Sequence, residues 1–307
     1  MIGKWNKRRI ELPDFIIPGA AKSGTTTLYR ILQQHPEVFV PSYHKETYFF
    51  SFFNRELTYE KEFQSHLIVN PIEYCDLFKG QSNKLMGEAS IGYLYDFEDC
   101  IQNMQKFYGE KTKEVKIIII LRNPIDRAFS HYNFLIRNGF ETLPFKEAIQ
   151  KDISEKRKKI RPGFDYLDYG KYYKQVKAFI DYFDHVKVFL FEDLKDFDRL
   201  SSEMFQFLEV DEIKIAQPIK ANPSGVPRSK FLVKLLRKNK FLAFVYRNFP
   251  LKMQDRLLNF RDRLLAKMLK RNQMDEEMRK HLSTYFEQDI RQLQKLIKRD
   301  LSHWLMK

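Results

Sequence analysis

Short apolar runs alternate with stretches of helical period along this chain. Strands are predicted at residues 15–17, 84–88, 117–120 and 186–191. The run at 117–120 is four consecutive isoleucines followed by Leu121, which is typical of a strand buried on both faces of a parallel sheet. Helical spacing is found within 14–34 and at 59–66, 124–137, 172–183 and 193–208. This alternation predicts an α/β fold with a central, mostly parallel sheet flanked by helices.

The composition fits one domain. Of 307 residues, 43% are hydrophobic and 15% aromatic, enough for an α/β domain with an ample core. We therefore treat 1–307 as a single domain, with a helical C-terminal region from about 229 to 307 packed on it. No apolar run approaches the ~20 residues that span a bilayer, and the basic segment 1–9 lacks the apolar stretch of a signal peptide. Cys75 and Cys100 give no disulfide framework and are expected to be free thiols, so a cytoplasmic protein is predicted.

A glycine-punctuated loop follows the first predicted strand of the sheet. Its sequence is Pro18-Gly19-Ala20-Ala21-Lys22-Ser23-Gly24-Thr25-Thr26-Thr27. Such a loop gathers backbone N–H groups at a helix N-terminus, where the macrodipole also favours an anion. Lys22 adds a positive charge, and the threonines add hydroxyl donors. The segment is interpreted as a phosphate-binding loop, and the alternative is a glycine-rich turn with an exposed lysine.

This loop differs from the P-loop of nucleoside triphosphatases in the position of its lysine. The P-loop pattern is G-x-x-x-x-G-K-[ST], and Gly19 and Gly24 keep its glycine spacing. Thr25 stands where the P-loop lysine would be, while Lys22 lies inside the loop. A lysine there can still reach a bridging or leaving phosphate oxygen. The pattern favours a phosphate that leaves without a metal ion, and no cluster of metal-ligand residues is visible in the sequence.

The isoleucine strand leads directly into a second anion-binding pattern. Asn123 suits a helix N-cap and Pro124 suits the first helical position, so a helix is expected to begin at once. Arg122 is thus expected at the carboxyl end of a central strand, where open α/β sheets bind their ligands. Ser130, about two turns into the helix, is expected to face the same crevice. An arginine with a hydroxyl partner suits a phosphate monoester, and the alternative is an ion pair between Arg122 and Asp126.

Together, the two segments resemble the sulfotransferases that use 3′-phosphoadenosine 5′-phosphosulfate (PAPS). Residues 22–27 resemble the family's 5′-phosphosulfate loop, and residues 122–132 resemble its 3′-phosphate motif, R-x-P-x-x-R-x-x-S-x-Y. His35-Pro36 and Lys45-Glu46-Thr47-Tyr48-Phe49-Phe50 are similar to the HP…KExxFF run of heparan-sulfate-type and related bacterial carbohydrate sulfotransferases. Further motifs follow in the family's order: Gly87-Glu88-Ala89-Ser90, Gly170-Lys171-Tyr172, Phe207-Leu208 and 299–304.

The resemblance implies a P-loop-like sulfotransferase fold and transfer of the sulfuryl group of PAPS to an acceptor hydroxyl on a carbohydrate. The product of the donor is 3′-phosphoadenosine 5′-phosphate (PAP), and no metal is implied. The donor-binding residues implied are Lys22, Ser23, Gly24, Thr25, Thr26, Thr27, Arg122, Ser130, Arg228, Ser229 and Lys230. The last three belong to a turn-rich basic loop that corresponds to the family's lid over the 3′-phosphate. The alternative for that loop is a flexible connector.

Catalytic roles also follow from the resemblance. Lys22 is the candidate that stabilises the leaving phosphate oxygen, and Glu46 matches the family's catalytic base. His44 is the alternative base, because imidazole is suited to proton transfer near neutral pH. Substrate contacts are assigned to Lys45, for the acceptor or the transferring sulfuryl group, and to Glu88, for the acceptor or as a structural cap. Many heparan-type members carry a lysine after that glutamate where this chain has Ala89, so the role of that lysine is missing or is taken by Lys45.

The charge of the chain is strongly basic, with 54 Lys+Arg against 40 Asp+Glu and a net charge of +14. No aromatic-interleaved basic repeat, zinc spacing or helix-turn-helix signature is present, so nucleic acid is not the expected partner. A positive cleft would instead steer the anionic donor and an anionic acceptor such as an acidic glycan. The basic, apolar segment 230–270 is interpreted as a peripheral membrane contact on anionic lipid, or as packing on the sheet or a homodimer face.

Several alternatives stay open from the sequence. Within the same chemistry, the acceptor is a lipid or a small secondary metabolite. In another class, the chain is a P-loop kinase, against which stand the displaced lysine and the lack of an acidic strand end for magnesium. A non-catalytic nucleotide-binding protein is the third alternative. Because Golgi members of the family carry a membrane anchor, a Golgi enzyme cut from its anchor is the alternative to a cytoplasmic protein.

Overall fold

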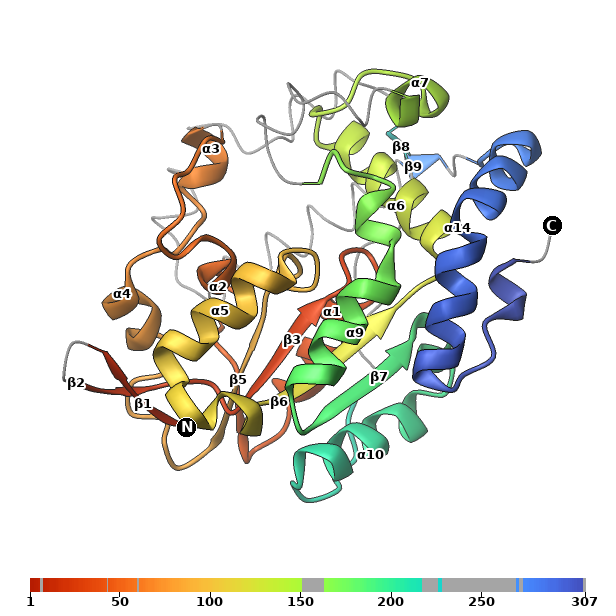
Figure 1. Cartoon of the computed structure of the whole chain (residues 1–307). Helices are drawn as coiled ribbons and strands as arrows, with labels where there is room; N and C mark the ends of the chain where they lie inside the picture. Colours follow the sequence, from red (N-terminus) through yellow and green to blue (C-terminus); the bar gives the residue numbers. More distant parts are fainter. Residues whose placement is uncertain are drawn as a thin grey trace.

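A five-stranded sheet forms the centre of the protein, in a computed structural model that describes residues 1–5, 8–42, 44–59, 61–150, 163–216, 226–227, 269–270 and 273–305. The strands are β3 (Phe15–Gly19), β4 (Val38–Phe39), β5 (Leu85–Ala89), β6 (Lys116–Leu121) and β7 (Val186–Leu190). Their order is β4-β5-β3-β6-β7, and every neighbouring pair is parallel (Figure 1). The predicted α/β fold with a mostly parallel central sheet is confirmed.

The strand β6, which lies between β3 and β7, is apolar on both of its faces. Ile117, Ile119 and Leu121 belong to one hydrophobic core, whereas Ile118 and Ile120 belong to the core on the opposite face of the sheet. Side chains alternate between the two faces along a strand, so a strand covered by helices on both sides needs apolar residues at every position. This requirement explains the uninterrupted isoleucine run.

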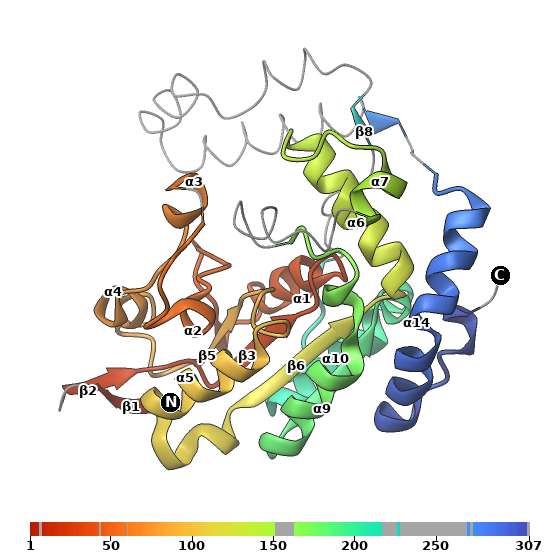
Figure 2. The ribbon, with the colours of Figure 1, turned by 45° about the horizontal axis from the view of Figure 1, so that its top comes forward.

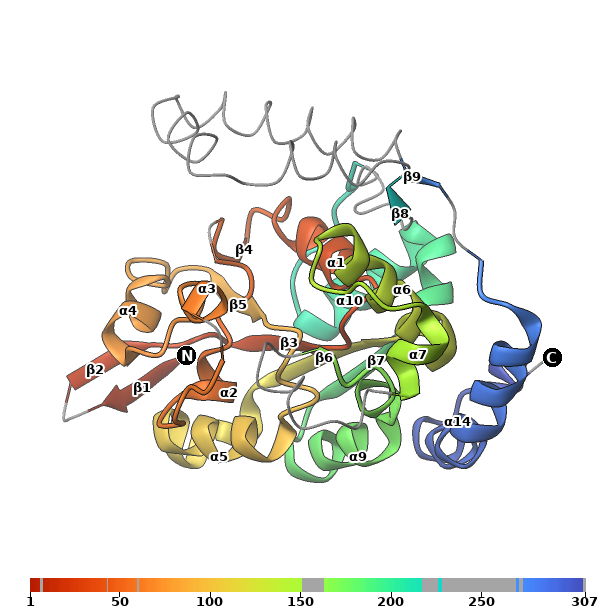
Figure 3. The same cartoon turned by 90° about the horizontal axis from the view of Figure 1, so that it is seen from above.

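Helices cover both faces of the sheet (Figure 3). On one face lie α1 (Thr25–Leu32) and α10 (Phe197–Leu208), and on the other lie α5 (Phe97–Tyr108) and α9 (Tyr172–Tyr182). The long helix α14 (Glu276–Ile297) packs against α9 and against α6 (Pro124–Arg137). The C-terminal helix therefore adds to the layer that contains α9.

The helix α6 has the bounds that the sequence predicts. The Asn123 side chain accepts a hydrogen bond from the Ile125 N–H at 3.0 Å, and Pro124 occupies the first turn. At the other end, the Gly139 N–H donates to the Ile136 carbonyl at 3.0 Å with a φ of 71° at Gly139. Local capping therefore sets both ends of the helix that begins beside Arg122.

Shorter elements surround the sheet. They are the antiparallel pairs β1 (Ile2–Trp5) with β2 (Arg8–Glu11) and β8 (Val226–Pro227) with β9 (Leu269–Lys270), the helices α2 (Phe49–Phe52), α3 (Lys61–Gln64), α4 (Pro71–Asp76) and α7 (Phe145–Gln150), and the 3-10 turns η1 (Gly109–Glu114), η2 (Asp168–Gly170), η3 (Phe191–Lys195) and η4 (Ser302–Trp304). The helix predicted at 59–66 is thus shorter than expected, and the one predicted from 193 begins at Phe197. Asp196 is the residue that caps it, because its carboxylate accepts from the Arg199 N–H at 3.2 Å.

Some predictions lie outside the described residues. They include the lid residues Arg228, Ser229 and Lys230 and, apart from β9, the segment 230–270. Cys75 and Cys100 are both buried free thiols, as predicted. In the described part of the chain, we find no helix with the length and apolar character needed to cross a bilayer.

Candidate functional site

The two predicted anion-binding segments lie at one edge of the sheet. Because β3, β5 and β6 are parallel, the loop after β3, the end of β5 and Arg122 after β6 share the carboxyl edge. Figure 2 shows α1 and α6 starting from that edge beside the ends of β3 and β6. The topology therefore brings the two anion-binding patterns of the sequence together.

The loop after β3 is shaped by residues in the left-handed region. Lys22 has a φ of 67° and Gly24 a φ of 108°, and the Ala20 N–H donates to the Ile120 carbonyl at 2.8 Å. A Cβ on Gly24 would come within 2.8 Å of the Leu194 side chain and would be strained at that φ. The loop therefore requires glycine at this position, where it turns into α1.

The N-terminus of α1 is available to an anion. Gly24 is the N-cap, and no side chain caps the helix. The first amides of a helix have no intrahelical partner, so the N–H groups of Thr25 and Thr26 can bind a ligand. Ser23 is 0% exposed, and within the described residues its hydroxyl makes no hydrogen bond of good geometry. An uncapped helix end beside a buried hydroxyl fits a bound phosphate or sulfate group.

Lys22 lies among like charges. Its Nζ is 4.5 Å from the centroid of the Phe134 ring, and its pKa is lowered to about 8. The main cause is burial, and Arg137 and Arg122 lower the pKa further, whereas Glu46 raises it. Positive charges gathered in this way create a potential that favours an anionic ligand.

Arg122 points toward the same loop. Its Nη1 donates to the Lys22 carbonyl at 3.3 Å, and its guanidinium carbon is 4.6 Å from the Phe191 ring centroid. Asp126, the predicted alternative partner, pairs instead with Arg279 at 2.6 Å. Over the ranges that the structure describes, Arg122 has no ion pair, so its charge is free to bind a phosphate. Ser130 is buried on α6, and its contact with a 3′-phosphate stays a prediction.

Glu46 and Lys45 reach the loop from the segment that precedes α2. Lys45 Nζ lies 3.1 Å from Glu46 Oε1 and donates to Thr25 Oγ1 at 3.3 Å. The Tyr48 hydroxyl donates to Glu46 Oε2 at 3.5 Å. Glu46 is 34% exposed, so its carboxylate is accessible beside the start of α1. His44 is exposed and has no polar contact with the described residues, whereas Glu46 is connected to the start of α1 through Lys45.

Glu88 does not reach the acceptor side. It is 1% exposed, and its carboxylate accepts hydrogen bonds from the hydroxyls of Thr47, Tyr74, Ser90 and Tyr93. Burial raises its pKa, and these hydrogen bonds oppose the increase. Four hydroxyls of the chain occupy the carboxylate, so the geometry fits the structural alternative predicted for Glu88 rather than a contact with the acceptor. Ala89 beside it is buried in the core.

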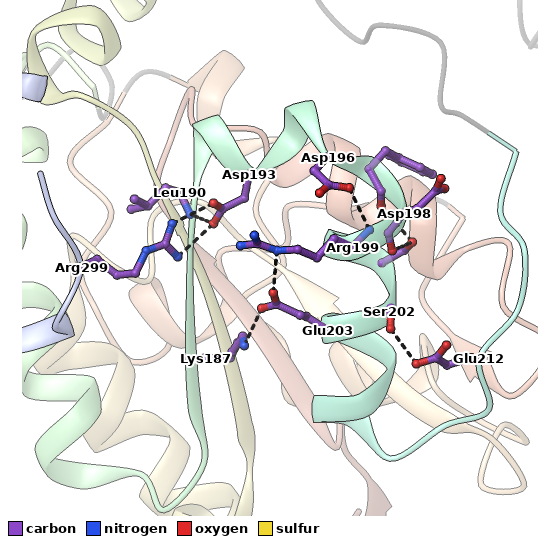
Figure 4. A network of polar contacts seen from close by, with 12 residues as sticks. Lys187, Leu190, Asp193, Asp196, Asp198, Arg199, Ser202, Glu203, Glu212 and Arg299 are labelled. Atoms are coloured by element: carbon purple, nitrogen blue, oxygen red, sulfur yellow. Dashed lines mark hydrogen bonds and ion pairs between the residues drawn. The ribbon is translucent and has the colours of Figure 1, made fainter.

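The C-terminal segment braces the ends of β6 and β7. The Asn123 side-chain amide donates to the Trp304 carbonyl at 3.1 Å, and the Trp304 indole donates to Glu192 Oε1 at 3.1 Å. Arg299 forms two hydrogen bonds with Asp193, at 2.8 and 3.3 Å (Figure 4). These contacts hold the chain that follows each strand, next to Arg122.

Arg299 offers a stability test with a matched control in the same view. Burial alone would raise the pKa of Asp193, but hydrogen bonds from Arg299 and the Leu190 N–H lower it below 3.8. Arg299→Ala is expected to reduce the free energy of unfolding by about 2 kcal/mol at pH 7, because it removes the hydrogen-bonded ion-pair partner of Asp193, whose side chain is only 12% exposed. Arg199→Ala, which removes a surface i,i+4 pair with Glu203, should cost less than about 0.5 kcal/mol.

The pH dependence of that difference provides its check. A lowered pKa stabilises the fold above the ordinary value of 3.8, and this contribution is lost as the pH falls. Urea unfolding of wild type and Arg299→Ala should therefore converge in acid. Equal unfolding free energies of the two proteins at pH 7 would show that the pair contributes nothing.

Two residues of α6 beside Lys22, Phe134 and Arg137, were not predicted from the sequence as part of the site. Arg137 lies within 5.5 Å of the Phe134 ring centroid, the same ring that Lys22 contacts. Residues 127, 130, 134 and 137 have the 3-4-3 spacing of one helix face, so the periodicity of the 124–137 helix contained the signal. The periodicity does not give the position of the loop after β3, and this position is what brings Lys22 into contact with that face of the helix.

Fold and site together define an α/β protein with a basic, glycine-containing loop at the carboxyl edge of its sheet. Residues 12–294 match the family model described as "Sulfotransferase domain", and the chain belongs to this family. The crystal structure of a sulfotransferase from Alicyclobacillus acidocaldarius is similar, with 30% identity, a TM-score of 0.71 and coverage of 97% of this chain and 100% of that one.

Two further relatives match part of the chain. The membrane-associated sulfotransferase kil1 of Dictyostelium discoideum is 33% identical over 127 residues, or 41% of this chain. The human bifunctional heparan sulfate N-deacetylase/N-sulfotransferase 3 is 32% identical over 134 residues, or 42% of this chain. The matched segments are 24% and 14% of those relatives' own lengths.

Proposed function

We propose that this protein transfers the sulfuryl group of PAPS to an acceptor hydroxyl on a carbohydrate. The observation that carries the proposal is the meeting of an accessible carboxylate, Glu46, with the uncapped N-terminus of α1 and Lys22. Glu46 would accept the proton of the acceptor, while Lys22 and the N-terminus of α1 would bind the departing anion. Membership of the sulfotransferase family supports the PAPS donor.

The donor would be held at its two ends. Lys22, the Ser23 hydroxyl and the amides from Gly24 to Thr26 would bind the 5′-phosphosulfate, as their charge and helix-end position suggest. Arg122 would bind the 3′-phosphate, with Ser130 as the additional donor. Lid contacts from 228–230 are part of the proposal but lie outside the described residues.

The reaction would proceed in line. The acceptor oxygen forms a bond to sulfur while the bond between sulfur and the 5′-phosphate oxygen breaks. The proton of the acceptor passes to Glu46, and negative charge appears on the departing PAP. Lys22 stabilises that charge, and Lys45, 3.3 Å from Thr25 Oγ1, lies where it can hold the transferring group.

The acceptor side is rich in positive charge, which supports an anionic glycan. Lys22 and Lys45 lie near the proposed base, Lys45 forms an ion pair with Glu46, and Arg137 lies beside Lys22. A relative is named as a heparan sulfate N-sulfotransferase, which supports a carbohydrate acceptor for this chain. A lipid or small metabolite is the alternative acceptor. The apolar surface of such a molecule would not be attracted electrostatically by these cations.

The experiment that tests the proposed function is transfer from radiolabelled PAPS. Purified protein would be assayed with acidic glycans, neutral glycans, lipids and small alcohols in parallel, without added magnesium. Labelled acidic glycan is the expected result. PAP binding without transfer to any acceptor would instead indicate a non-catalytic nucleotide-binding protein. Magnesium-dependent transfer from ATP would indicate a kinase.

Proton uptake on binding PAP is a further expected result. Lys22 has a pKa of about 8 in the free protein, so at about pH 9 most molecules hold it neutral. A bound phosphate favours the charged form, so binding takes up a proton and the affinity for PAP falls as the pH rises through about 8. Calorimetry in two buffers of different ionisation enthalpy measures the uptake. Uptake that is unchanged in Lys22→Met would assign the proton to another group.

A further inference from the structure

Three consecutive backbone amides begin the short helix α2. The N–H groups of residues 48–50 donate to three hydroxyls, those of Ser90, Thr47 and Tyr93, at 3.1, 3.2 and 3.2 Å. No side chain of the N-cap residue itself caps the helix. The start of α2 is therefore held by hydroxyls, two of which come from the chain that follows β5.

These three hydroxyls converge on one carboxylate oxygen. Ser90, Thr47 and Tyr93 donate to Glu88 Oε1 at 2.8, 2.6 and 2.7 Å. Each hydroxyl oxygen already accepts an amide hydrogen bond, so its own hydrogen is available to the carboxylate. The Tyr74 hydroxyl donates to the other oxygen, Oε2. Glu88 therefore stabilises the start of α2 indirectly, because it orients the three hydroxyls that accept hydrogen bonds from the amides of residues 48–50.

The capped segment directly follows the proposed base. Glu46 precedes Thr47, and Tyr48 both donates its N–H to Ser90 and directs its hydroxyl at Glu46 Oε2. Lys45 spans from Glu46 to Thr25 at the start of α1. A shift of the turn at 47–48 would therefore move the carboxylate relative to the donor loop.

We propose that Glu88 is a positioning residue for Glu46, acting through the Thr47, Ser90 and Tyr93 hydroxyls. This inference rests on the proposed function. Glu88 touches neither donor nor acceptor, since it is 1% exposed. Its effect is to fix the distance between the base and the sulfuryl group. A misplacement of about 1 Å costs about 100-fold in rate in such reactions, whereas binding of the donor at Lys22 and Arg122 would be spared.

Thr47 supplies the matched pair of variants that tests the relay. Thr47→Val keeps the shape and removes the hydroxyl, whereas Thr47→Ser keeps the hydroxyl. We expect Thr47→Val to lose about 10- to 100-fold in kcat, with the Kd for PAP within about 2-fold of wild type. Amide hydrogen exchange at 48–50 should become at least about 10-fold faster in this variant. Thr47→Ser should restore both exchange and kcat.

The possible outcomes distinguish failure of the positioning role of Glu88 from failure of the proposed function. Fast exchange at 48–50 with an unchanged kcat would overturn the positioning role, and so would an equal loss of PAP affinity and kcat. A wild type that shows protected amides and binds PAP but transfers no sulfate would overturn the proposed function instead. If Thr47→Val does not fold, Tyr93→Phe removes the relay to the residue 50 amide and is read in the same way.

Discussion

Replacing Lys22 with methionine is expected to reduce sulfuryl transfer by about 100- to 1000-fold. The reason is that the ammonium stabilises charge that appears only as the 5′-phosphate leaves, and loss of one such donor typically costs this much. Its low pKa, about 8, reflects a site in which burial and neighbouring arginines already disfavour the cation before an anion binds. The measurement is kcat with PAPS at about pH 7, where Lys22 is charged.

The control for this prediction is Lys79→Met. Lys79 is exposed, and its side chain forms no ion pair within the part of the chain that the structure describes. This control removes the same charge and should change kcat by less than about 2-fold. Retention of more than a third of the wild-type kcat by Lys22→Met would contradict the leaving-group role.

Glu46→Gln is expected to lower kcat by about 100- to 10,000-fold while the affinity for PAP stays within about 2-fold. A general base contributes this range, and the amide keeps the size of the side chain but accepts no proton. The carboxylate is bound by Lys45 and Tyr48, so glutamine can retain part of that geometry. Measuring both kcat and the affinity for PAP in this variant distinguishes loss of the base from damage to the donor site.

His44→Ala decides between the two predicted bases. His44 is exposed and lacks polar contacts among the described residues, so this variant should keep at least about half of the wild-type kcat. If instead Glu46→Gln transfers sulfate normally and His44→Ala does not, the base is His44. The reverse pattern supports the assignment to Glu46.

The sequence predicted the helix and strand ends around the proposed donor site well because their signals are local. The turn at Gly24 and the caps of α6 depend on residues within a few positions, and the structure has the predicted helix 124–137 unchanged. Arg122 lies at the carboxyl end of β6 because the parallel sheet, itself read from the isoleucine run, leaves it there. Short-range patterns were sufficient for these elements.

The sequence left the contacts of Glu88 open because two of its hydroxyl partners, Thr47 and Tyr74, are distant along the chain. Its hydroxyl donors stand at positions 47, 74, 90 and 93, and they meet only when the segment between β4 and β5 folds over the sheet edge. From its place in the sequence alone, Glu88 fits a contact with the acceptor and a structural cap equally well. The start of α10 was misplaced for a related reason, since Asp193 bonds Arg299, more than a hundred positions away, and leaves Asp196 to cap the helix.

The most direct test of the central claim is calorimetric binding of PAP against ADP, without magnesium, to wild type and Arg122→Ala. We expect wild type to prefer the 3′,5′-bisphosphate by at least about 10-fold and Arg122→Ala to lose this preference, because a bidentate contact to the 3′-phosphate is removed. A preference for ADP, or binding that requires magnesium, would contradict the donor site on which the proposed sulfuryl transfer depends.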